Sequence, residues 1–530
     1  MRSKKFLAVA ISIVTLSIGW LGITGLTLLV ALVPLLWISH KTEDSRRGWW
    51  SMFGYALLAF VGWNLSTIWW IGYATPVGPF AATLASSFYS IVAFMIFHTI
   101  SKRAPKALAY TALTSIWIAF EYNYTVSEFS WPWLLLGNGF SNDIWAIQWY
   151  EYTGIFGGSL WVLLSNILLF EAVISTKTGV RRWLKPALMT SLPLAVSLLI
   201  YATYEVPQGA RSMEVTVIQP NVDCYDKFAG TDRFQEDNII EMLHRVPKRS
   251  ELILLPETSV PRYYDIESYH EAPFFTKMVK LVEARAPKAT LICGSNSVRR
   301  YADGEQSETA RDGGERGYYD LYNSAVAVRN NIRLRQLNVQ VRNKARLVIG
   351  VENTPSWVFK VFRFFVIDIG GVVGQIGKGT TAEPFIVGKA GVNVGGAICY
   401  EGLYGNFIGE FVRGGAELLT IISNDGWWGN TPGHKHLYSL SQVRAVEHRR
   451  YIARSANTGV SGFINSRGDN IESLGWQERG ALTQEVKLSK EMTIYTQYGD
   501  YIARVMCFVA LLSILYFVAY RARKRHYLVS

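Results

Sequence analysis

Three polar side chains of different types stand in or at the ends of apolar runs, and together they could carry out acyl transfer. Glu257 closes "LILLPE", Cys399 closes "VNVGGAIC", and Lys344 lies in "VRNKARLVIGVE". A cysteine attacks as its thiolate, whereas a free thiol is mostly protonated at neutral pH. A carboxylate can accept that proton as a general base, and an ammonium can stabilise the oxyanion of a tetrahedral intermediate. The set predicts nucleophilic chemistry centred on Cys399.

Each of these residues also has a purely structural interpretation. Cys399 could be a small buried hydrophobe, a common fate of free cysteine. Glu257 could be a solvated acid at the end of a strand, and Lys344 a surface lysine beside Arg342 and Arg346. The residues that surround Cys399 and Glu257 favour the chemical interpretation for those two.

The region from residue 213 to about 490 alternates short β-rich runs with helical stretches. Most of the runs are continuously apolar, which is typical of sheets covered on both faces. The region therefore predicts an α/β domain with helices layered on sheets. The expected strands are 213–219, 252–256, 289–295, 323–328, 392–399, 418–424 and 451–457; the expected helices are 233–246, 274–286 and 434–449; and the polar stretch 299–320 is expected to form an exposed hairpin or loop.

Outside this region the composition indicates a membrane protein. Half of the chain is hydrophobic and only 18% is charged, below the usual quarter. A spanning helix needs roughly 20 apolar residues, so the runs 6–39 and 49–101 each hold two passes, with bends at Gly22 and Gly25 and at 72–79. Further passes are expected at 108–120, 155–170, 187–204 and 505–520, which makes about eight in total.

Basic clusters at both ends and in the short loops set the predicted orientation. Short cytoplasmic loops carry an excess of Lys and Arg. Because two predicted passes separate each basic cluster from the next, all the clusters lie on one side of the membrane, which is the cytoplasmic side. We expect a membrane domain over 1–205 with about seven transmembrane helices, an extracytoplasmic catalytic domain over 206–495, and a final helix with a basic cytoplasmic tail over 496–530. The first run is expected to be retained rather than cleaved as a signal peptide. These clusters partly explain the net charge of +12, so no nucleic-acid partner is expected.

Several other side chains carry weaker signals. In an oxidising compartment Cys224 and Cys293 could form a disulfide, which the sequence alone cannot pair. His434 and His436 are expected to lie at a helix start rather than on a metal, and no metal or cofactor is expected. Trp131 and Trp133 could be interfacial belt residues, and Glu121, Glu151 and Glu171 are expected at helix ends near the interface.

An ordered set of motifs resembles the nitrilase or carbon–nitrogen hydrolase superfamily. It consists of "LLPET" (254–258), Lys344, "GGAICYE" (395–401) and "ISNDGWWG" (422–429). With the predicted passes, and with "SWPWLLLGN" (130–138), "IQPNVDCYDKF" (218–228) and the segment 433–462, the whole chain resembles the apolipoprotein N-acyltransferases. The resemblance implies a multi-pass α-helical membrane domain plus an extracytoplasmic nitrilase-like α-β-β-α sandwich.

Carried over by position, the resemblance implies that Glu257 is the general base, Lys344 the catalytic lysine and Cys399 the nucleophile. It also implies three supporting active-site residues, Glu352, Tyr400 and Glu401. Trp427 and Trp428 are implied candidates for a lipid entrance. One departure is that "KARLVIGVE" lacks the proline and phenylalanine of the Pro-Phe-Gly segment usual in the family, which predicts a differently shaped loop.

The resemblance further implies the reaction. A membrane phospholipid would donate an acyl chain to Cys399, and a diacylglyceryl apolipoprotein would accept it, at the bacterial inner membrane with the catalytic domain in the periplasm. Each buried CH₂ is worth about 0.8 kcal/mol, so such a site must reach the level of the lipid headgroups. A monomer is expected. The alternatives are a membrane-bound amidase or nitrilase that uses water, and a transporter or scaffold with an inactive domain.

Overall fold

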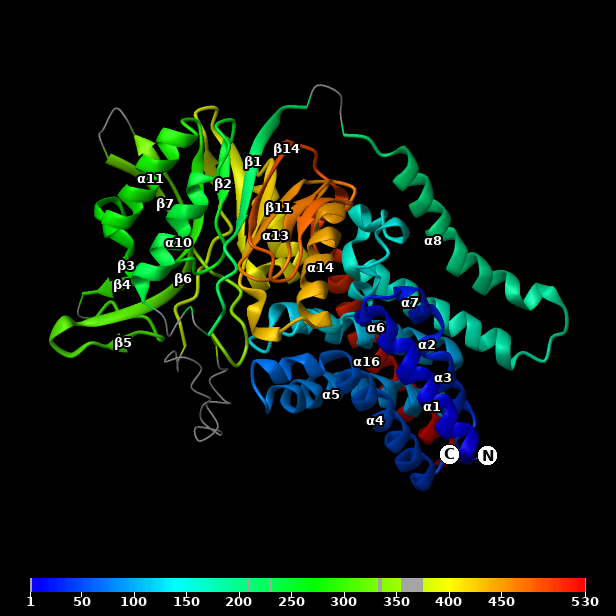
Figure 1. Ribbon diagram of the computed structural model, residues 1–530. Helices are drawn as coiled ribbons and strands as arrows, with labels where there is room; N and C mark the ends of the chain where they lie inside the picture. The colour runs from blue at the N-terminus through cyan, green and yellow to red at the C-terminus, as the bar shows by residue number, and fades with distance from the viewer. Residues whose placement is uncertain are drawn as a thin grey trace. The chain divides into compact units, whose positions relative to one another are not determined.

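The computed structural model describes residues 2–206, 210–225, 227, 231–302, 304–331, 336–353 and 375–529. The chain divides into two compact units (Figure 1). The first comprises Met1–Tyr204 and Tyr498–Ser530 and is called the membrane unit after its predicted passes; the second comprises Glu205–Gln497 and is called the catalytic unit after the chemistry predicted for its residues.

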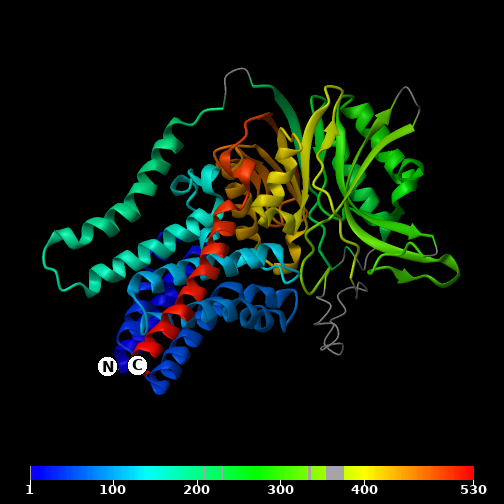
Figure 2. The same cartoon turned by 180° about the vertical axis from the view of Figure 1, so that it is seen from behind.

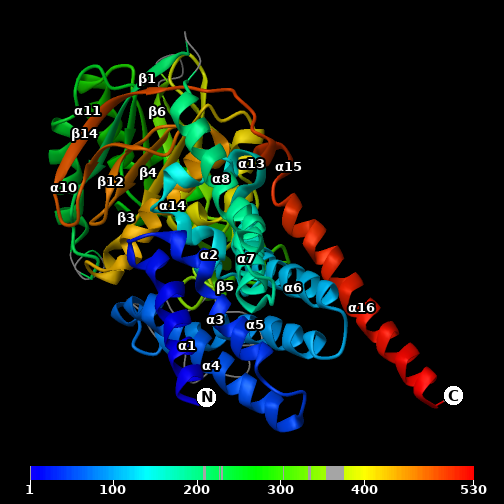
Figure 3. The ribbon, with the colours of Figure 1, turned by 90° about the vertical axis from the view of Figure 1, so that its right-hand side faces the viewer.

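The membrane unit is built of helices. They are α1 (Arg2–Ser17), α2 (Leu28–Ala31), α3 (Val33–His40), α4 (Arg46–Ile68), α5 (Gly78–Ser101), α6 (Lys106–Val126), α7 (Tyr150–Ile174), α8 (Leu184–Thr203) and α16 (Tyr501–Val529). Although α16 comes from the far end of the chain, it packs along α6 and also contacts α7 (Figures 2 and 3). The final helix therefore belongs to the same bundle as the N-terminal ones.

Six helical segments in the described part of the chain are long and apolar enough to cross a membrane: Arg2–Leu21, Arg46–Tyr73, Gly78–Ser101, Tyr150–Ile174, Val180–Thr203 and Tyr501–Lys524. The two other predicted passes fall on the shorter apolar stretch Gly25–His40 and on α6. The number of passes stays a prediction, since these segments are recognised by length and composition.

The predicted bends in the two long apolar runs are confirmed. After α1 the chain turns at Gly22, whose φ of +81° lies in the left-handed region that favours glycine. The next turn is held by Asp143, whose Oδ2 accepts a hydrogen bond of 2.6 Å from the Gly25 amide. In the second run, α4 gives way to a short 3₁₀ turn over Trp69–Tyr73, and α5 then begins at Gly78 with a proline in its first turn.

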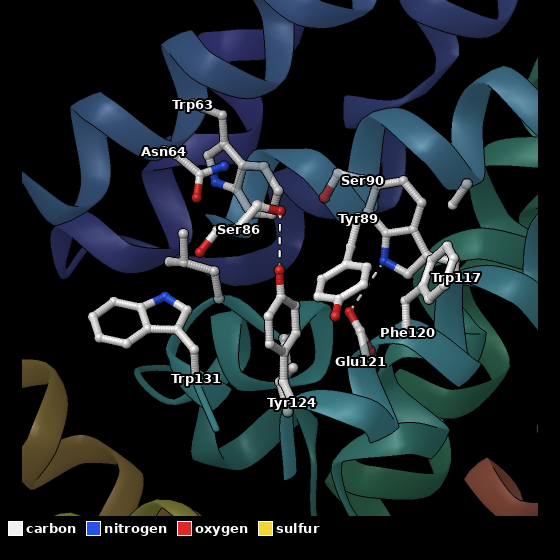
Figure 4. Close-up of a pocket in the computed structure, with 13 residues that line it drawn as sticks. Trp63, Asn64, Ser86, Tyr89, Ser90, Trp117, Phe120, Glu121, Tyr124 and Trp131 are labelled. Atoms are coloured by element: carbon white, nitrogen blue, oxygen red, sulfur yellow. Dashed lines mark hydrogen bonds between the residues drawn. The ribbon is translucent and has the colours of Figure 1, made fainter. Parts of the chain in front are cut away.

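The predicted places of the acidic residues at helix ends are confirmed for Glu151 and Glu171, which lie in the first and last turns of α7. Glu121 and Glu151 are buried within the unit, with 5% and 8% exposure. Burial of Glu121 is supported by donors, since its Oε1 accepts hydrogen bonds from the Trp117 indole (Figure 4) and the Leu136 amide. Trp133 is also buried rather than part of an interfacial belt.

The catalytic unit contains two sheets. The eight-stranded sheet runs β14-β1-β2-β4-β6-β5, with β3 paired to β4 and β7 paired to β6; the six-stranded sheet runs β13-β12-β11-β10-β9-β8. The first sheet comprises β1 (Ser212–Gln219), β2 (Leu252–Leu254), β3 (Val260–Asp265), β4 (Thr290–Tyr301), β5 (Arg311–Asp312), β6 (Tyr318–Asn331), β7 (Gln336–Asn343) and β14 (Gly480–Lys487). The second comprises β8 (Phe385–Val387), β9 (Val392–Ile398), β10 (Leu418–Ser423), β11 (Ile452–Ala456), β12 (Ser461–Ile464) and β13 (Asn470–Leu474).

Helices cover the outer face of each sheet, and the inner faces meet. On the first sheet lie α10 (Asp232–His244) and α11 (Pro273–Arg285), and on the second α13 (Gly405–Arg413) and α14 (Pro432–His448) (Figure 1). Between the sheets, β1 contacts β11 and β6 contacts β9. The predicted α-β-β-α sandwich is confirmed, and each expected strand and helix overlaps an observed one.

The core under α10 and α11 explains why these elements form. Met242, Ile253, Phe275 and Leu291 are fully buried in one apolar cluster with their neighbours. Each such side chain stabilises the fold by about 1.5–3 kcal/mol relative to exposure. Cys293 lies in the same cluster and, like Cys224, Cys399 and Cys507, is a free thiol. The disulfide that was left open between Cys224 and Cys293 is therefore not formed.

Candidate active site

Glu257 follows β2 at the carboxyl end of the strand and is almost completely buried, with 5% exposure. The neighbouring strand β4 passes so close that a Cβ on Gly294 would lie 2.5 Å from the Cα of Glu257. Only glycine permits this approach. Glu257 Oε1 accepts hydrogen bonds from Asn323 Nδ2 at 2.7 Å and Lys344 Nζ at 2.9 Å, and Oε2 accepts one from the Asn424 amide at 2.9 Å.

Lys344 follows β7 and is buried, with 1% exposure. Its backbone amide donates to the Asn323 carbonyl at 2.8 Å, which continues the pairing of β7 with β6. Its ammonium lies 2.9 Å from Glu257 Oε1 and 2.9 Å from Glu352 Oε1. Lys344 is therefore not a surface lysine, because the sheet register carries it inward to two carboxylates.

Glu352 is fixed by its own backbone turn as well as by the lysine. Its Oε2 accepts a hydrogen bond of 2.9 Å from the Val348 amide, and its Oε1 also accepts from Asn323 Nδ2 at 3.0 Å. Asn323 and Lys344 thus bridge the same two carboxylates, Glu257 and Glu352. Residues 354–374, which follow this turn, lie outside the described residues, as do Asp226 and Phe228 of the motif at 218–228.

The charges of this cluster support one another. Burial acts to raise the pKa of Glu257, but the Lys344 ammonium and the hydrogen bonds from Lys344 and Asn323 outweigh it and hold that pKa below its usual value. Burial acts to lower the pKa of Lys344, but the Glu257 and Glu352 carboxylates hold it well above its usual value. The resting site therefore contains an ionised carboxylate ready to accept a proton beside a permanent ammonium.

Cys399 lies where β9 ends and a 3₁₀ turn over Cys399–Leu403 begins. Its φ of +49° is left-handed, a strained conformation for a residue with a Cβ. Glu401 holds this turn, since its Oε2 accepts a hydrogen bond of 2.7 Å from the Ile398 amide and its Oε1 accepts one of 2.6 Å from the Ala345 amide. One buried carboxylate therefore ties the turn that carries Cys399 to the segment that carries Lys344.

Arg342 also joins the end of β7 to the Cys399 turn and to β9. Its guanidinium forms an ion pair with Glu401 in which both side chains are buried, and its Nε donates to the Gly396 carbonyl of β9 at 2.8 Å. Glu401 is therefore a buried ion-pair partner of Arg342, and its supporting role in the active site stays a prediction. Arg342 and Lys344 are two residues apart at the end of β7, which places them on the same face of the strand.

The Cys399 thiol is neutral at rest. Burial and the negative charge of Glu257 raise its pKa, while Lys344 and a hydrogen bond from Ser423 act to lower it without reversing the shift. The charges of Glu257 and Lys344 therefore both act on this thiol. A neutral thiol under the influence of an ionised carboxylate is a combination that general-base activation of a nucleophile can use.

The remaining predicted residues are Tyr400, Trp427 and Trp428, and they differ in burial and in their contacts. Tyr400 is buried, with its ring centroid 5.5 Å from that of Tyr404. Trp427 and Trp428 are half-buried in the short turn that follows Asn424, whose amide contacts Glu257. Trp427 also packs edge-on against Tyr225, at 5.4 Å between ring centroids. The roles carried over for these residues stay predictions.

Sequence reasoning missed several residues of this site. Asn323 bridges both carboxylates, and the buried Lys227 donates to the Glu257 carbonyl at 2.8 Å and to Thr258 Oγ1 at 2.9 Å. Asn323 stood as the first, polar residue of a run already expected to be a strand. That position is the one signal that could have identified it.

Comparisons with known proteins match both units. The family model described as carbon-nitrogen hydrolase matches residues 215–493, more than half of the chain, and the one described as apolipoprotein N-acyltransferase N-terminal domain matches residues 12–168. An apolipoprotein N-acyltransferase from Chlorobaculum tepidum is 29% identical over 499 residues, covering 91% of this chain and 90% of its own. One from Geobacter metallireducens is 27% identical over 425 residues, covering 78% and 74%.

A solved structure of a CN-hydrolase superfamily protein from Xanthomonas campestris matches 52% of this chain and 91% of its own, at 16% identity and a TM-score of 0.35. The two matched domains and the six apolar helices identify a multi-pass membrane protein. The chain belongs to the carbon–nitrogen hydrolase family and resembles the apolipoprotein N-acyltransferases over nearly its whole length.

Proposed function

We propose that this protein transfers an acyl chain from a membrane phospholipid to the N-terminal diacylglyceryl-cysteine of apolipoproteins, through a thioester on Cys399. The observation that carries the proposal is the buried contact of 2.9 Å between Lys344 Nζ and Glu257 Oε1, whose charges both act on the Cys399 thiol. The names of the relatives supply the acceptor, and the transmembrane helices fit a donor that lies in a bilayer.

In the first half-reaction the Cys399 sulfur attacks the carbonyl carbon of a phospholipid ester. The thiol proton passes to Glu257, and a carbon–sulfur bond forms as the carbonyl oxygen becomes an oxyanion. Lys344 and backbone amides next to Tyr400 stabilise that oxyanion; a single such donor is typically worth about 3 kcal/mol of barrier. The ester carbon–oxygen bond then breaks, Glu257 returns the proton to the leaving alkoxide, and a lysophospholipid departs.

In the second half-reaction the α-amino group of a diacylglyceryl-cysteine attacks the thioester carbon. Glu257 accepts a proton from the attacking amine, the carbon–sulfur bond breaks, and the sulfur leaves as a thiolate that is reprotonated. The product is an N-acylated lipoprotein and the free enzyme, as in other ping-pong reactions. This scheme needs no cofactor.

The proposal includes a location. We place the catalytic unit on the periplasmic side of the bacterial inner membrane, because the basic clusters at 2–5, 40–47, 101–106, 177–185 and 521–526 mark the opposite side as cytoplasmic. Exposing each CH₂ of the donor's acyl chain to water would cost about 0.8 kcal/mol. Acyl transfer from a phospholipid is therefore easier at a site that is joined to a membrane unit. We propose a monomer, since one chain supplies Glu257, Lys344 and Cys399.

The experiment that tests the proposal follows the acyl group. Detergent-solubilised protein is incubated with a phospholipid that carries a labelled acyl chain, and the protein is examined for a hydroxylamine-sensitive adduct mapped by mass spectrometry. We expect the label on Cys399, its retention in the absence of an acceptor, and its transfer when a diacylated lipopeptide is added. The variant C399A should form no adduct.

Two results would contradict the proposal. Release of free fatty acid at the same rate with and without lipopeptide would identify a hydrolase. No adduct on the wild-type protein, with either phospholipid or lipopeptide present, would identify an inactive domain.

A further inference from the structure

Lys227 carries a buried ammonium of the catalytic unit that the acyl-transfer scheme does not use. Its exposure is 6%, and its Nζ donates to the Glu257 carbonyl at 2.8 Å and to Thr258 Oγ1 at 2.9 Å. In the described part of the chain these are its two hydrogen-bond acceptors, and neither carries a charge. A buried ammonium is costly unless a negative charge compensates it, so its presence beside Glu257 points to a function.

The ammonium contacts a strained turn of the backbone. Thr258 has a φ of +47°, in the left-handed region that is unfavourable for a residue with a Cβ. Its hydroxyl donates to the Glu257 carbonyl at 2.8 Å, so the ammonium, the hydroxyl and the carbonyl all contact one another. Such a conformation persists only where its surroundings hold it. The Lys227 ammonium therefore stabilises the turn that carries Glu257.

The same turn packs against β4. A Cβ on Gly294 would lie 2.3 Å from the Thr258 amide nitrogen, and Ser259 Oγ donates to the Gly294 carbonyl at 3.2 Å. The strand and Lys227 thus hold one turn, the strand through close packing and the lysine through hydrogen bonds. Of the two, Lys227 is the one whose side chain a substitution can remove without disturbing the sheet.

Lys227 is itself held in place through its backbone. Its amide donates to the Asp223 carbonyl at 2.9 Å, and its carbonyl accepts a hydrogen bond from the buried Gln235 side chain. The segment before it is anchored by Asn457, whose Nδ2 donates to the Val222 carbonyl at 2.7 Å. A side chain on a backbone that is fixed in this way can position its neighbour accurately.

Asn457 also connects this segment to the carboxylate of Glu257. Its Nδ2 donates to Asn424 Oδ1 at 3.0 Å, and the Asn424 amide donates to Glu257 Oε2 at 2.9 Å. Glu257 is thus held at both ends, its backbone by Lys227 and its carboxylate by Asn424. Loss of the backbone contact would change the position of the carboxylate relative to its donors.

The charge of Lys227 acts on Glu257 as well. Against the effect of burial, the charges of Lys344 and Lys227 both lower the pKa of Glu257. In return, burial lowers the pKa of Lys227 to about 7, while the charges of Glu257 and Cys224 act to raise it. The other charged or titratable groups that face this pair are Cys224, Lys344, Glu352 and Cys399.

We propose that Lys227 is a positioning residue for the base of the reaction. By holding the Glu257 carbonyl and the Thr258 hydroxyl, its ammonium keeps the Glu257 carboxylate ionised and in contact with its donors. The inference rests on the proposed acyl transfer, in which Glu257 accepts the thiol proton. It adds to that transfer a second lysine, which acts on the base rather than on the substrate.

The test measures the pH dependence of acyl-adduct formation from the labelled phospholipid, with full-length protein in detergent. K227M removes the ammonium, so the pKa of Glu257 rises and a higher pH is needed to ionise the base. We expect adduct formation to be about tenfold slower near neutral pH, and its acid limb to move up by about half a pH unit or more. K227R keeps a cation and should return the acid limb to its wild-type position.

K5M is the matched control, because Lys5 is a buried lysine of the membrane unit whose Nζ donates to Thr42 Oγ1 at 3.2 Å. It should leave the acid limb in place. A merely structural role of Lys227 would lower the unfolding temperature or the rate without moving the limb, so an unmoved acid limb in K227M would overturn the inference. Should K227M not fold, K227Q replaces it, since glutamine keeps an N–H donor without the charge, and the same two outcomes apply.

Failure of the proposed acyl transfer has a different signature. Wild-type protein that forms no adduct at any pH contradicts the transfer, and amide hydrogen exchange then decides the role of Lys227. In that case we expect the peptide 255–260 to exchange about tenfold faster in K227M than in wild type, and at the wild-type rate in K5M. Unchanged exchange of this peptide in K227M would overturn the inference.

Discussion

Lys344 Nζ lies 2.9 Å from Glu257 Oε1, although 87 residues separate the two in the chain. Both side chains are buried, and a second carboxylate, that of Glu352, lies at the same distance from the ammonium. Two carboxylates around one ammonium keep the lysine charged. Burial and the negative charge of Glu257 together explain why Cys399 remains a neutral thiol until Glu257 accepts its proton.

The first prediction concerns the reactivity of Cys399 toward iodoacetamide, which reports the thiolate fraction. The raised pKa of Cys399 predicts slow alkylation near neutral pH and a rate that still increases above about pH 9, the usual thiol value. Removing the negative charge in E257Q lowers the thiol pKa, and removing the ammonium in K344M raises it. At a fixed pH we therefore expect alkylation of E257Q to be faster than wild type and that of K344M to be slower.

Peptide mapping separates this rate from those of the other thiols. Cys293, which lies fully buried in the core of the catalytic unit, provides the internal reference that neither substitution should change. Slower alkylation in E257Q would show that the carboxylate lowers the thiol pKa, opposite to the electrostatics described above. Acyl-adduct formation should nevertheless decline in E257Q, because the base is lost.

A second prediction concerns Asn323, which donates to both Glu257 and Glu352. In N323L each carboxylate loses a donor, and we expect a stability cost of about 1–3 kcal/mol. The pKa of Glu257 should also rise, because a hydrogen bond that lowers it is removed. Since the base must be ionised, the acid limb of the rate of adduct formation should move to higher pH.

The matched control for Asn323 is Asn330 of the same strand, which is exposed and donates to Glu283 at 2.8 Å. N330L should change stability by no more than about 0.5 kcal/mol and leave the pH profile in place. An unmoved acid limb in N323L would show that the asparagine does not influence Glu257.

A third prediction concerns the buried ion pair of Arg342 and Glu401. R342M leaves the Glu401 carboxylate buried without its cation, which typically costs about 3–5 kcal/mol. We expect a clear drop in the unfolding temperature of the catalytic unit and slower adduct formation, since Glu401 holds the Cys399 turn. Replacing both residues, in R342M/E401L, should cost less stability than R342M alone.

An exposed pair calibrates this measurement. Arg479 lies 2.7 Å from Glu241, and both side chains are substantially exposed, so R479M should cost about 1 kcal/mol or less. A loss in R342M as small as that in R479M would mean that burial of the Arg342–Glu401 pair has no energetic consequence.

Local sequence patterns could predict the strands that are buried on both faces. The mostly apolar runs that became β2, β9 and β10 are examples, because a strand covered on both faces needs apolar side chains at successive positions. The edge strand β13 has mostly exposed residues and gave no such signal. Helix α14 begins at Pro432, two residues before its expected start, where Thr431 accepts a hydrogen bond from the Gly433 amide.

The residues of the site were predictable only in part, because some of them meet their partners through sheet pairing rather than through the local sequence. Glu257 and Cys399 stand directly after apolar runs, so their burial near strand ends could be expected from the chain itself. Arg342 gave no signal of its own, because its partner, Glu401, lies 59 residues away. Asn323 stood at the start of an expected strand, but its two carboxylate partners follow only from the register that places it beside Lys344. Partners brought together by sheet pairing leave no mark in the local pattern.

A last prediction concerns the backbone at Cys399. Its φ of +49° is unfavourable for any residue with a Cβ but not for glycine, and such strain typically costs about 1–3 kcal/mol. Neither alanine nor glycine supplies a nucleophile, so both C399A and C399G should fail to form the acyl adduct. Thermal unfolding should nevertheless find C399G more stable than C399A, the reverse of the order usual in strands and helices. The opposite order would mean that the turn relaxes when the thiol is removed, and that the strain resides in the contacts of the sulfur rather than in the backbone.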